Sequence, residues 1–231
     1  IDHIKSLLDK GANINFAGRV NNSSDSHFIM PLFSPLAAAA QAKNFEIVKY
    51  LIEKGADPND GLCLYGDDID ILDYLLKHGA DPNKGHPESG TMPPIIGADV
   101  NKMRLLIKYG ANVNLASKYG DTPLIWASST GNKAAIELLL DNGANINAVS
   151  TLKLEKNVES PVGTALMSAV NYGKIDSVKF LLAHCADINI ENENGLTALK
   201  LAEQNFIAST DPVHWENFKS IKVNHDIVSV L

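Results

Sequence analysis

Apolar and polar residues alternate along this chain with the spacing of short amphipathic helices, and these helices end alike. Within residues 47–52 the aliphatic positions follow i, i+1, i+4 and i+5, which places them on one stripe of a helix. Gly55 follows at the position where a helix closes with a left-handed residue. Residues 57–59 (Asp-Pro-Asn) then provide turn chemistry. The pattern predicts a short helix that buries one face and ends in a glycine-closed turn.

The same nine-residue pattern recurs along the chain: two aliphatic residues, two variable residues, Gly-Ala, Asp or Asn, any residue, and Asn. The copies are LLDKGANIN (7–15), LIEKGADPN (51–59), LLKHGADPN (75–83), LIKYGANVN (106–114), LLDNGANIN (139–147) and LLAHCADIN (181–189). The sixth copy carries Cys185 in place of the glycine. Self-similarity at such intervals predicts repeated structural units, each packed on its neighbours, rather than one globule built from distant segments.

A second pattern lies upstream of several copies and predicts a first helix before the glycine-closed one. It reads SPLAAAAQ (34–41), TPLIWASSTG (122–131), TALMSAVNYG (164–173) and TALKLAEQN (197–205). The leading Ser or Thr suits a helix N-cap, and proline suits the first helical turn. Small residues follow, where two helices must approach closely. Each unit is therefore expected to contain a cap, a short helix, a turn, a second helix and a closing loop.

Together the two patterns resemble the ankyrin repeat, with its T-P-L-H-x-A-A opening and L-L-x-x-G-A-D-x-N close. The resemblance implies an all-α fold, an ankyrin-repeat solenoid of stacked helix-turn-helix units with hairpin-like loops. We expect five to six repeats, some irregular, and partial repeats at both ends of a single domain over 1–231. The predicted boundaries are 1–16 (partial), 34–60, 61–84 (shortened), 90–115 (shortened), 121–148, 163–190 and 196–231 (terminal, with an insertion).

Several segments depart from the family pattern. Insertions are expected at 17–33, 149–160 and 205–225, and the first two fall where the family places its β-hairpin fingers. The first helix around 62–67 should be stunted, and Pro93-Pro94 should shorten the next one. The histidine of the first helix is replaced at the four matching positions, which are Ala37, Ile125, Met167 and Lys200. Because the terminal segments resemble incomplete repeats, we expect a piece of a longer protein.

Composition and charge narrow the possible partners. Of 231 residues 45% are hydrophobic, which is too many for a disordered chain. Lys and Arg number 20 against 27 Asp and Glu, a net charge of −7 that argues against non-specific nucleic-acid binding and against anionic membranes. No apolar run is long enough to span a bilayer. Two cysteines favour a reducing compartment, so we expect a cytoplasmic protein.

No residue pattern indicates catalysis, a cofactor or a metal. The acidic cluster within 67–73 is expected to be a helix N-terminus enriched in acid, with a divalent-ion site as the alternative. His184 and Cys185 are adjacent, which is poor geometry for sharing a metal. A left-handed backbone at Cys185 would be strained, and a functional thiol there is the alternative.

The resemblance also implies a binding surface, made of loop tips and first-helix faces on the concave side. The matching positions in this sequence are Lys118, Tyr119, Asp121, Ser129, Thr130, Asn171, Tyr172, Glu191, Glu193, Asn194, Leu196 and Gln204. Trp126 occupies the family's buried leucine position, so we expect it in the core, with a binding anchor as the alternative. Trp215 either seals the third insertion or is itself an exposed anchor.

The expected function is a non-catalytic, monomeric scaffold that binds a partner protein or peptide in its concave groove. One alternative is an inhibitor of a partner enzyme, with the segment 149–160 entering an acidic cleft through Lys153 and Lys156. Another is the target-recognition part of a multidomain enzyme or bacterial effector, which would act in the host-cell cytosol. The sequence names no partner, because a fold fixes the platform and not its target.

Overall fold

The computed structural model describes residues 2–16, 34–62, 68–85, 92–150, 163–209 and 227–231. These residues form α-helices and one 3₁₀ helix, and no strand occurs among them. The predicted all-α fold of helix-turn-helix repeats is confirmed. The chain divides into two compact units, Ile1–Ala111 and Asn112–Leu231, which are described separately. The individual repeat boundaries stay a prediction.

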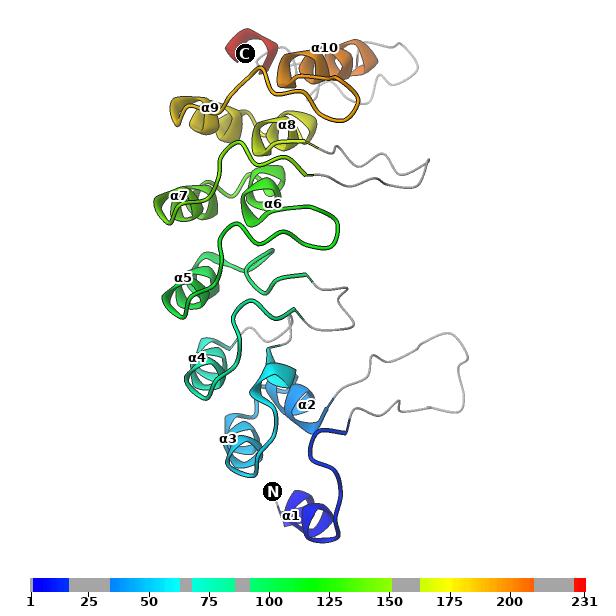
Figure 1. Cartoon of the computed structure of the whole chain (residues 1–231), viewed down its shortest axis with the longest axis vertical. Helices are drawn as coiled ribbons and strands as arrows, with labels where there is room; N and C mark the ends of the chain where they lie inside the picture. Colours follow the sequence, from blue (N-terminus) through cyan, green and yellow to red (C-terminus); the bar gives the residue numbers. More distant parts are fainter. Residues whose placement is uncertain (1, 17–33, 63–67, 86–91, 151–162, 210–226) are drawn as a thin grey trace, which may run out of the picture. The chain divides into compact units, whose positions relative to one another are not determined.

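The first unit contains one complete helix pair followed by two incomplete ones (Figure 1). Its elements are α1 (Asp2–Asp9), α2 (Pro35–Gln41), α3 (Phe45–Glu53), η1 (Pro58–Gly61), α4 (Ile69–Lys77) and α5 (Val100–Lys108). Helices α2 and α3 pack against each other, and the 3₁₀ helix η1 contacts both α2 and α4. In the described part of the unit, α4 and α5 have no α-helix directly before them.

A proline-containing turn stands where the first helix before α5 was expected. Residues 94–97 form this turn, and the backbone N–H of Ile96 donates to the carbonyl of Pro93 (3.0 Å). Ile95 and Ile96 are each only 1% exposed, so they fill the core that a helix would otherwise supply. The expected shortening at Pro93-Pro94 is therefore confirmed. The expectation for 62–67 falls almost wholly outside the described residues.

The second unit repeats a regular pairing (Figure 1). Its elements are α6 (Pro123–Thr130), α7 (Lys133–Asp141), α8 (Ala165–Asn171), α9 (Ile175–Ala183) and α10 (Ala198–Ser209), with a further helical stretch at 227–230. Helix α6 packs on α7 and α8 packs on α9, while α8 lies between α6 and α10. The core consists of side chains that are almost fully buried, including Leu124, Ile136, Leu139, Leu166 and Leu181.

The predicted N-caps are confirmed in both units. The hydroxyl of Ser34 accepts from the backbone N–H of Ala37 (3.2 Å), and that of Thr122 accepts from Ile125 (3.2 Å). Thr164 caps α8 in the same way. Each cap satisfies one of the orphan donors at a helix start, so these residues set where the first helices begin.

The closing motif is held by a local turn and by a bond to the next copy. The first Asp or Asn accepts from the N–H two residues on, as Asp57 Oδ1 does from Asn59 (2.9 Å). The final Asn reaches forward to the N–H of the following copy's Asp or Asn. These bonds run from Asp57 N to Asn15 (2.9 Å), from Asp81 N to Asn59 (2.9 Å), from Asn145 N to Asn114 (2.7 Å) and from Asp187 N to Asn147 (2.9 Å). We call this series the asparagine ladder.

The backbone at the closing position is left-handed in every copy. Gly55 has φ +89° and Gly143 has φ +84°, a conformation that glycine adopts without steric cost. Cys185 has φ +63° at the equivalent position, which confirms the predicted left-handed backbone there. Its side chain is exposed, so this site is strained without a packing gain.

Candidate interaction surface

The loop before α6 ends in a tight, hydrogen-bonded tip. The N–H of Ser117 donates to the carbonyl of Asp121 (2.9 Å), and that of Gly120 donates back to Ser117 (2.9 Å). The Ser117 hydroxyl also accepts from the N–H of Tyr119 (3.1 Å). This turn presents Lys118 and Tyr119 outward, with the Tyr119 side chain 43% exposed and the ammonium of Lys118 4.8 Å from its ring centre.

Asp121 lies at the base of this tip rather than on its outer side. The residue is half-buried, and this burial raises the pKa of its carboxyl group, although a hydrogen bond with the Ser150 hydroxyl acts in the opposite direction. The carbonyl of Tyr119 also accepts from this hydroxyl (3.3 Å), so the carbonyl and the Asp121 carboxylate share its single proton. Asp121 and Ser150 therefore connect the tip to the following segment, and Asp121 offers less surface to a partner than its sequence position implied.

Trp126 is 39% exposed, so the expectation that it packs in the core was wrong. The reason lies in the helical geometry of α6. Its buried positions are 123, 124, 125, 127 and 128. Apart from Pro123 in the first turn, these cover one side of the helix at about 100° per residue. Trp126 points to the opposite side and shares it with Thr130, one turn later. The matching position in the ankyrin repeat predicted that Trp126 is buried, whereas its angular position around α6 explains why it is exposed.

The two hydroxyls at the end of α6 bond to their own helix. Ser129 Oγ donates to the carbonyl of Trp126 (2.7 Å), and Thr130 Oγ1 donates to that of Ala127 (3.0 Å). Such bonds are common for Ser and Thr within helices. Both hydroxyls can still accept a hydrogen bond, but their donor capacity is already used.

Helix α8 is buried along its length and emerges only at its end. Residues 165–170 are all buried, while Asn171 is exposed and Tyr172 is 53% exposed. In the repeat pattern these two residues match Ser129 and Thr130 of α6. Since α6 and α8 pack side by side, matching positions on neighbouring repeats contribute to one face of this unit.

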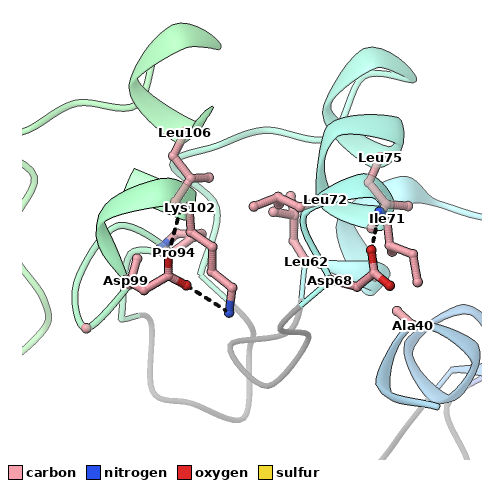
Figure 2. Close-up of a pocket in the computed structure, with 13 residues that line it drawn as sticks. Ala40, Leu62, Asp68, Ile71, Leu72, Leu75, Pro94, Asp99, Lys102 and Leu106 are labelled. Atoms are coloured by element: carbon pink, nitrogen blue, oxygen red, sulfur yellow. Dashed lines mark hydrogen bonds and ion pairs between the residues drawn. The ribbon is translucent and has the colours of Figure 1, made fainter. Parts of the chain in front are cut away.

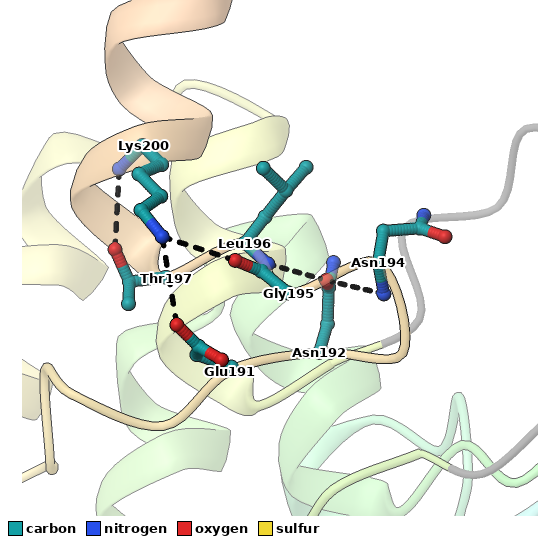
Figure 3. A network of polar contacts seen from close by, with 7 residues as sticks. All are labelled: Glu191, Asn192, Asn194, Gly195, Leu196, Thr197 and Lys200. Atoms are coloured by element: carbon teal, nitrogen blue, oxygen red, sulfur yellow. Dashed lines mark hydrogen bonds and ion pairs between the residues drawn. The ribbon is translucent and has the colours of Figure 1, made fainter.

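The loop before α10 forms a second tip, closed by a buried amide. Asn192 is 8% exposed, and its Oδ1 accepts from the N–H of Asn194 (3.0 Å) and of Leu196 (3.0 Å). The N–H of Gly195 donates to the carbonyl of Asn192 (2.9 Å). Figure 3 shows this network, in which the side chain of Asn194 points away from the turn. Glu193 and Asn194 are exposed, whereas Leu196 is only partly exposed.

Lys200 fastens this second tip to the first turn of α10. Its ammonium donates to the carbonyl of Gly195 (3.2 Å) and lies 3.5 Å from Glu191 Oε1 (Figure 3). Lys200 stands where the ankyrin pattern has its first-helix histidine. The replacement therefore supplies a different tie between helix and loop, and it engages Glu191, one of the predicted partner-binding residues.

All the predicted partner-binding residues belong to the second unit, but they differ in exposure. The exposed ones are Lys118, Tyr119, Thr130, Asn171, Tyr172, Glu191, Glu193, Asn194 and Gln204, whereas Asp121, Ser129 and Leu196 are partly buried. Sequence reasoning missed the exposure of Trp126 and the supporting roles of Asn192 and Lys200. No pattern in residues 123–130 could have found the first of these, because the apolar residues of α6 are spread around the helix and the polar Ser128 is among the buried ones.

A pocket of about 200 Å³ lies in the first unit, between α4 and α5 (Figure 2). Apolar side chains such as Leu72 and Leu106 line it together with the N-cap residues Asp68 and Asp99. Asp68 Oδ1 accepts from two N–H groups of α4, which confirms the helix N-terminus expected there. Lys102 Nζ lies 3.9 Å from Asp99 Oδ2.

Neither metal ligation nor membrane insertion has structural support within the described ranges. No group of three or more His, Cys, Asp or Glu is arranged there to hold a metal ion. None of the described helices is long and apolar enough to cross a bilayer.

Comparison with known families agrees with the repeat architecture. Models described as "Ankyrin repeats (3 copies)", "Ankyrin repeats (many copies)" and "Ankyrin repeat" match residues 61–150, 155–202 and 32–61. The chain belongs to the ankyrin repeat family. Ankyrin repeats generally mediate protein–protein interaction, and domains built from them are typically not enzymes.

Proteins with similar sequences come from animals and from a poxvirus. A putative palmitoyltransferase ZDHHC13 of Danio rerio is 30% identical over 88% of this chain, which covers 25% of that protein. A putative ankyrin repeat protein of Fowlpox virus (strain NVSL) is 36% identical over 45% of the chain, which covers 28% of it. The ankyrin repeat and SAM domain-containing protein 6 of Rattus norvegicus is 34% identical over 39% of the chain, which covers 9% of it. The chain thus spans less than a third of these relatives.

Proposed function

We propose that this ankyrin repeat chain is a non-catalytic scaffold that binds a partner protein or peptide through the second unit. The surface consists of the two loop tips and the exposed positions of the first helices, with Trp126 added to the residues expected from sequence. The supporting observation is that Tyr119, Trp126 and Tyr172 are 43%, 39% and 53% exposed on this unit. Aromatic side chains of this kind dominate the energetics of protein interfaces.

The rigidity of the two loop tips also supports this proposal. Each tip is closed by a side-chain oxygen, that of Ser117 or Asn192, which accepts backbone N–H groups. Lys200 further ties the second tip to α10. Preformed loops lose little conformational entropy on binding, so more of the contact energy appears as affinity.

We expect the chain to bind its partner as a monomer. Its two cysteines favour a reducing compartment, so we expect this binding to take place in the cytoplasm.

A second candidate is target recognition within a longer protein. It is favoured by the small share of the relatives that this chain spans, 25% in the case of the putative palmitoyltransferase. In that case the same surface would select a target for activity located elsewhere. The inhibitor alternative depends on the segment 149–160, which lies almost entirely outside the described residues, so no contact described above favours it.

Affinity capture with matched variants tests the proposal. The variants Tyr119→Ala, Trp126→Ala and Tyr172→Ala each remove one exposed aromatic side chain from the second unit. Phe16→Ala is the control, because Phe16 is 65% exposed in the first unit and lies outside the proposed surface. We expect partners captured by the unchanged chain to be lost with the first three variants and kept with the control, while circular dichroism shows all four folded. Equal capture by all four variants would refute the proposal that these aromatic residues form the binding surface.

A further inference from the structure

The loop tip before α10 carries an Asn-Gly pair, Asn194-Gly195. Asn194 is exposed, its side chain points away from the turn in Figure 3, and this side chain has no hydrogen-bond partner among the described residues. Gly195 has φ +69°, and a Cβ placed there would meet nothing closer than 4.0 Å. We propose that Asn194 is a site of spontaneous deamidation, which converts this loop tip to a more acidic form.

The chemistry requires only water and the chain itself. The backbone nitrogen of Gly195 loses its proton and attacks the side-chain carbonyl carbon of Asn194, forming a five-membered succinimide ring. Ammonia leaves with the side-chain nitrogen, and water then opens the ring at one of its two carbonyls. The products are Asp, or an isoaspartyl linkage in which the backbone runs through the former side chain. Glycine favours the step because it has no Cβ to hinder the ring, and the space beside Gly195 is open.

A second Asn-Gly pair in the chain, Asn142-Gly143, provides an internal comparison. Asn142 follows the last residue of α7, and its Nδ2 donates to the carbonyl of Leu138 (2.8 Å). Because this bond ties the side chain to the helix, the Asn142 carbonyl carbon is less free to turn toward the Gly143 nitrogen. The two glycine N–H groups are otherwise alike, since Gly143 donates to Leu140 (3.0 Å) and Gly195 to Asn192 (2.9 Å). The difference in side-chain tethering therefore predicts that Asn194 reacts faster.

Deamidation would change both the charge and the shape of the tip. The new carboxylate would join Glu191 and Glu193, which are both exposed on the same loop. An isoaspartyl linkage would also lengthen the backbone between the two N–H groups that Asn192 Oδ1 now accepts. Any effect on a partner rests on the proposed function, whereas the modification itself does not.

The test is a time course of the full chain in ¹⁸O-labelled water at mildly alkaline pH. Ring opening incorporates the heavy oxygen, so peptide mapping by mass spectrometry reports each site separately. We expect label at Asn194 to appear several-fold faster than at Asn142 in the folded chain, and the two rates to converge in denaturant. The variant Asn194→Gln should lose the fast site, whereas Asn142→Gln should retain it.

Two results would overturn the proposal. One is a folded chain in which Asn194 is labelled no faster than Asn142, which would mean that the turn suppresses the reaction as fully as the helix end does. The other is a fast site that persists in Asn194→Gln. Because the readout is covalent and needs no partner, neither result bears on whether the second unit binds proteins.

Discussion

Residues 34–111 and 117–190 share the same closing motif but differ in what precedes it. In the second stretch each closing helix is paired with a capped first helix, α6 with α7 and α8 with α9. In the first stretch only α2 and α3 form such a pair, while the 3₁₀ helix η1 and the turn at 94–97 precede α4 and α5.

The comparison teaches which parts of the repeat are constant. The second helix, the left-handed closing residue and the asparagine ladder occur in both stretches. The first helix can be replaced, provided that residues such as Ile95 and Ile96 fill the core. The replacement leaves a pocket beside α4 and α5 in the first unit. Regular first helices, in contrast, position Trp126 and Tyr172 on the second unit.

The largest expected effect comes from truncating the first leucine of the closing motif in each stretch. Leu139 is 0% exposed, so Leu139→Ala should lower the free energy of unfolding by about 2–5 kcal/mol. Leu106 is 1% exposed but lines the pocket, so it has fewer contacts to lose and Leu106→Ala should fall at the lower end of that range. Urea unfolding followed by circular dichroism measures both. If Leu106→Ala lowered the free energy of unfolding as much as Leu139→Ala or more, the proposed difference in packing between the two stretches would be wrong.

Two glycines that contact side chains test how tightly the replaced helix is packed. A Cβ added to Gly61 in η1 would lie 2.7 Å from Leu75 Cδ1 and 3.3 Å from Leu36 Cγ, so Gly61→Ala should cost about 1–3 kcal/mol. A Cβ on Gly163 would meet the sulfur of Met167, which lies toward the far end of a flexible side chain, and would lie 3.2 Å from Met167 Cβ. Gly163→Ala should therefore lower the melting temperature less than Gly61→Ala, and the reverse order would argue against a rigid 3₁₀ segment.

The asparagine ladder should contribute a smaller, local amount. Asn114 accepts from the N–H of Asn145 (2.7 Å) and donates to the carbonyl of Gly143 (3.0 Å). Asn114→Ala removes both bonds and should cost about 1–2 kcal/mol. Asn189 is the matched control, because within the described residues its side chain bonds only to Asp187 in its own motif. Hydrogen exchange at the N–H of Asn145 should accelerate in Asn114→Ala and stay unchanged in Asn189→Ala.

The smallest effect is a gain in stability from relieving strain at the last closing residue. Cys185→Gly should raise the free energy of unfolding by about 1 kcal/mol, since φ +63° suits glycine. The converse variant Gly143→Cys, at φ +84°, should lose a similar amount. Thermal unfolding measures both, and a neutral or destabilising Cys185→Gly would show that the thiol makes a compensating contact.

Much of the fold could be predicted because its signals are local. The caps at Ser34 and Thr122, the left-handed closing residues and the interruption at Pro93-Pro94 each depend on residues adjacent in sequence. The ladder could not be predicted, because its partners lie 22 to 42 residues apart and either could bond to water instead. The exposure of Trp126 depends on the side of α6 to which it points, and the contacts of Lys200 depend on how far its side chain extends toward the loop. A match to a position of the ankyrin repeat specifies neither.

The asparagine ladder also bears on how such a chain can change over evolution. Each asparagine side chain of the ladder bonds one closing loop to the next. This bond does not depend on the structure that the residues between the two loops form. Insertions such as 149–160 can therefore lengthen the chain between two rungs without breaking the bond from Asn147 to Asp187. Such bonds allow the residues between two closing loops to vary in number and composition while the loops themselves stay joined, as Asp187 is to Asn147.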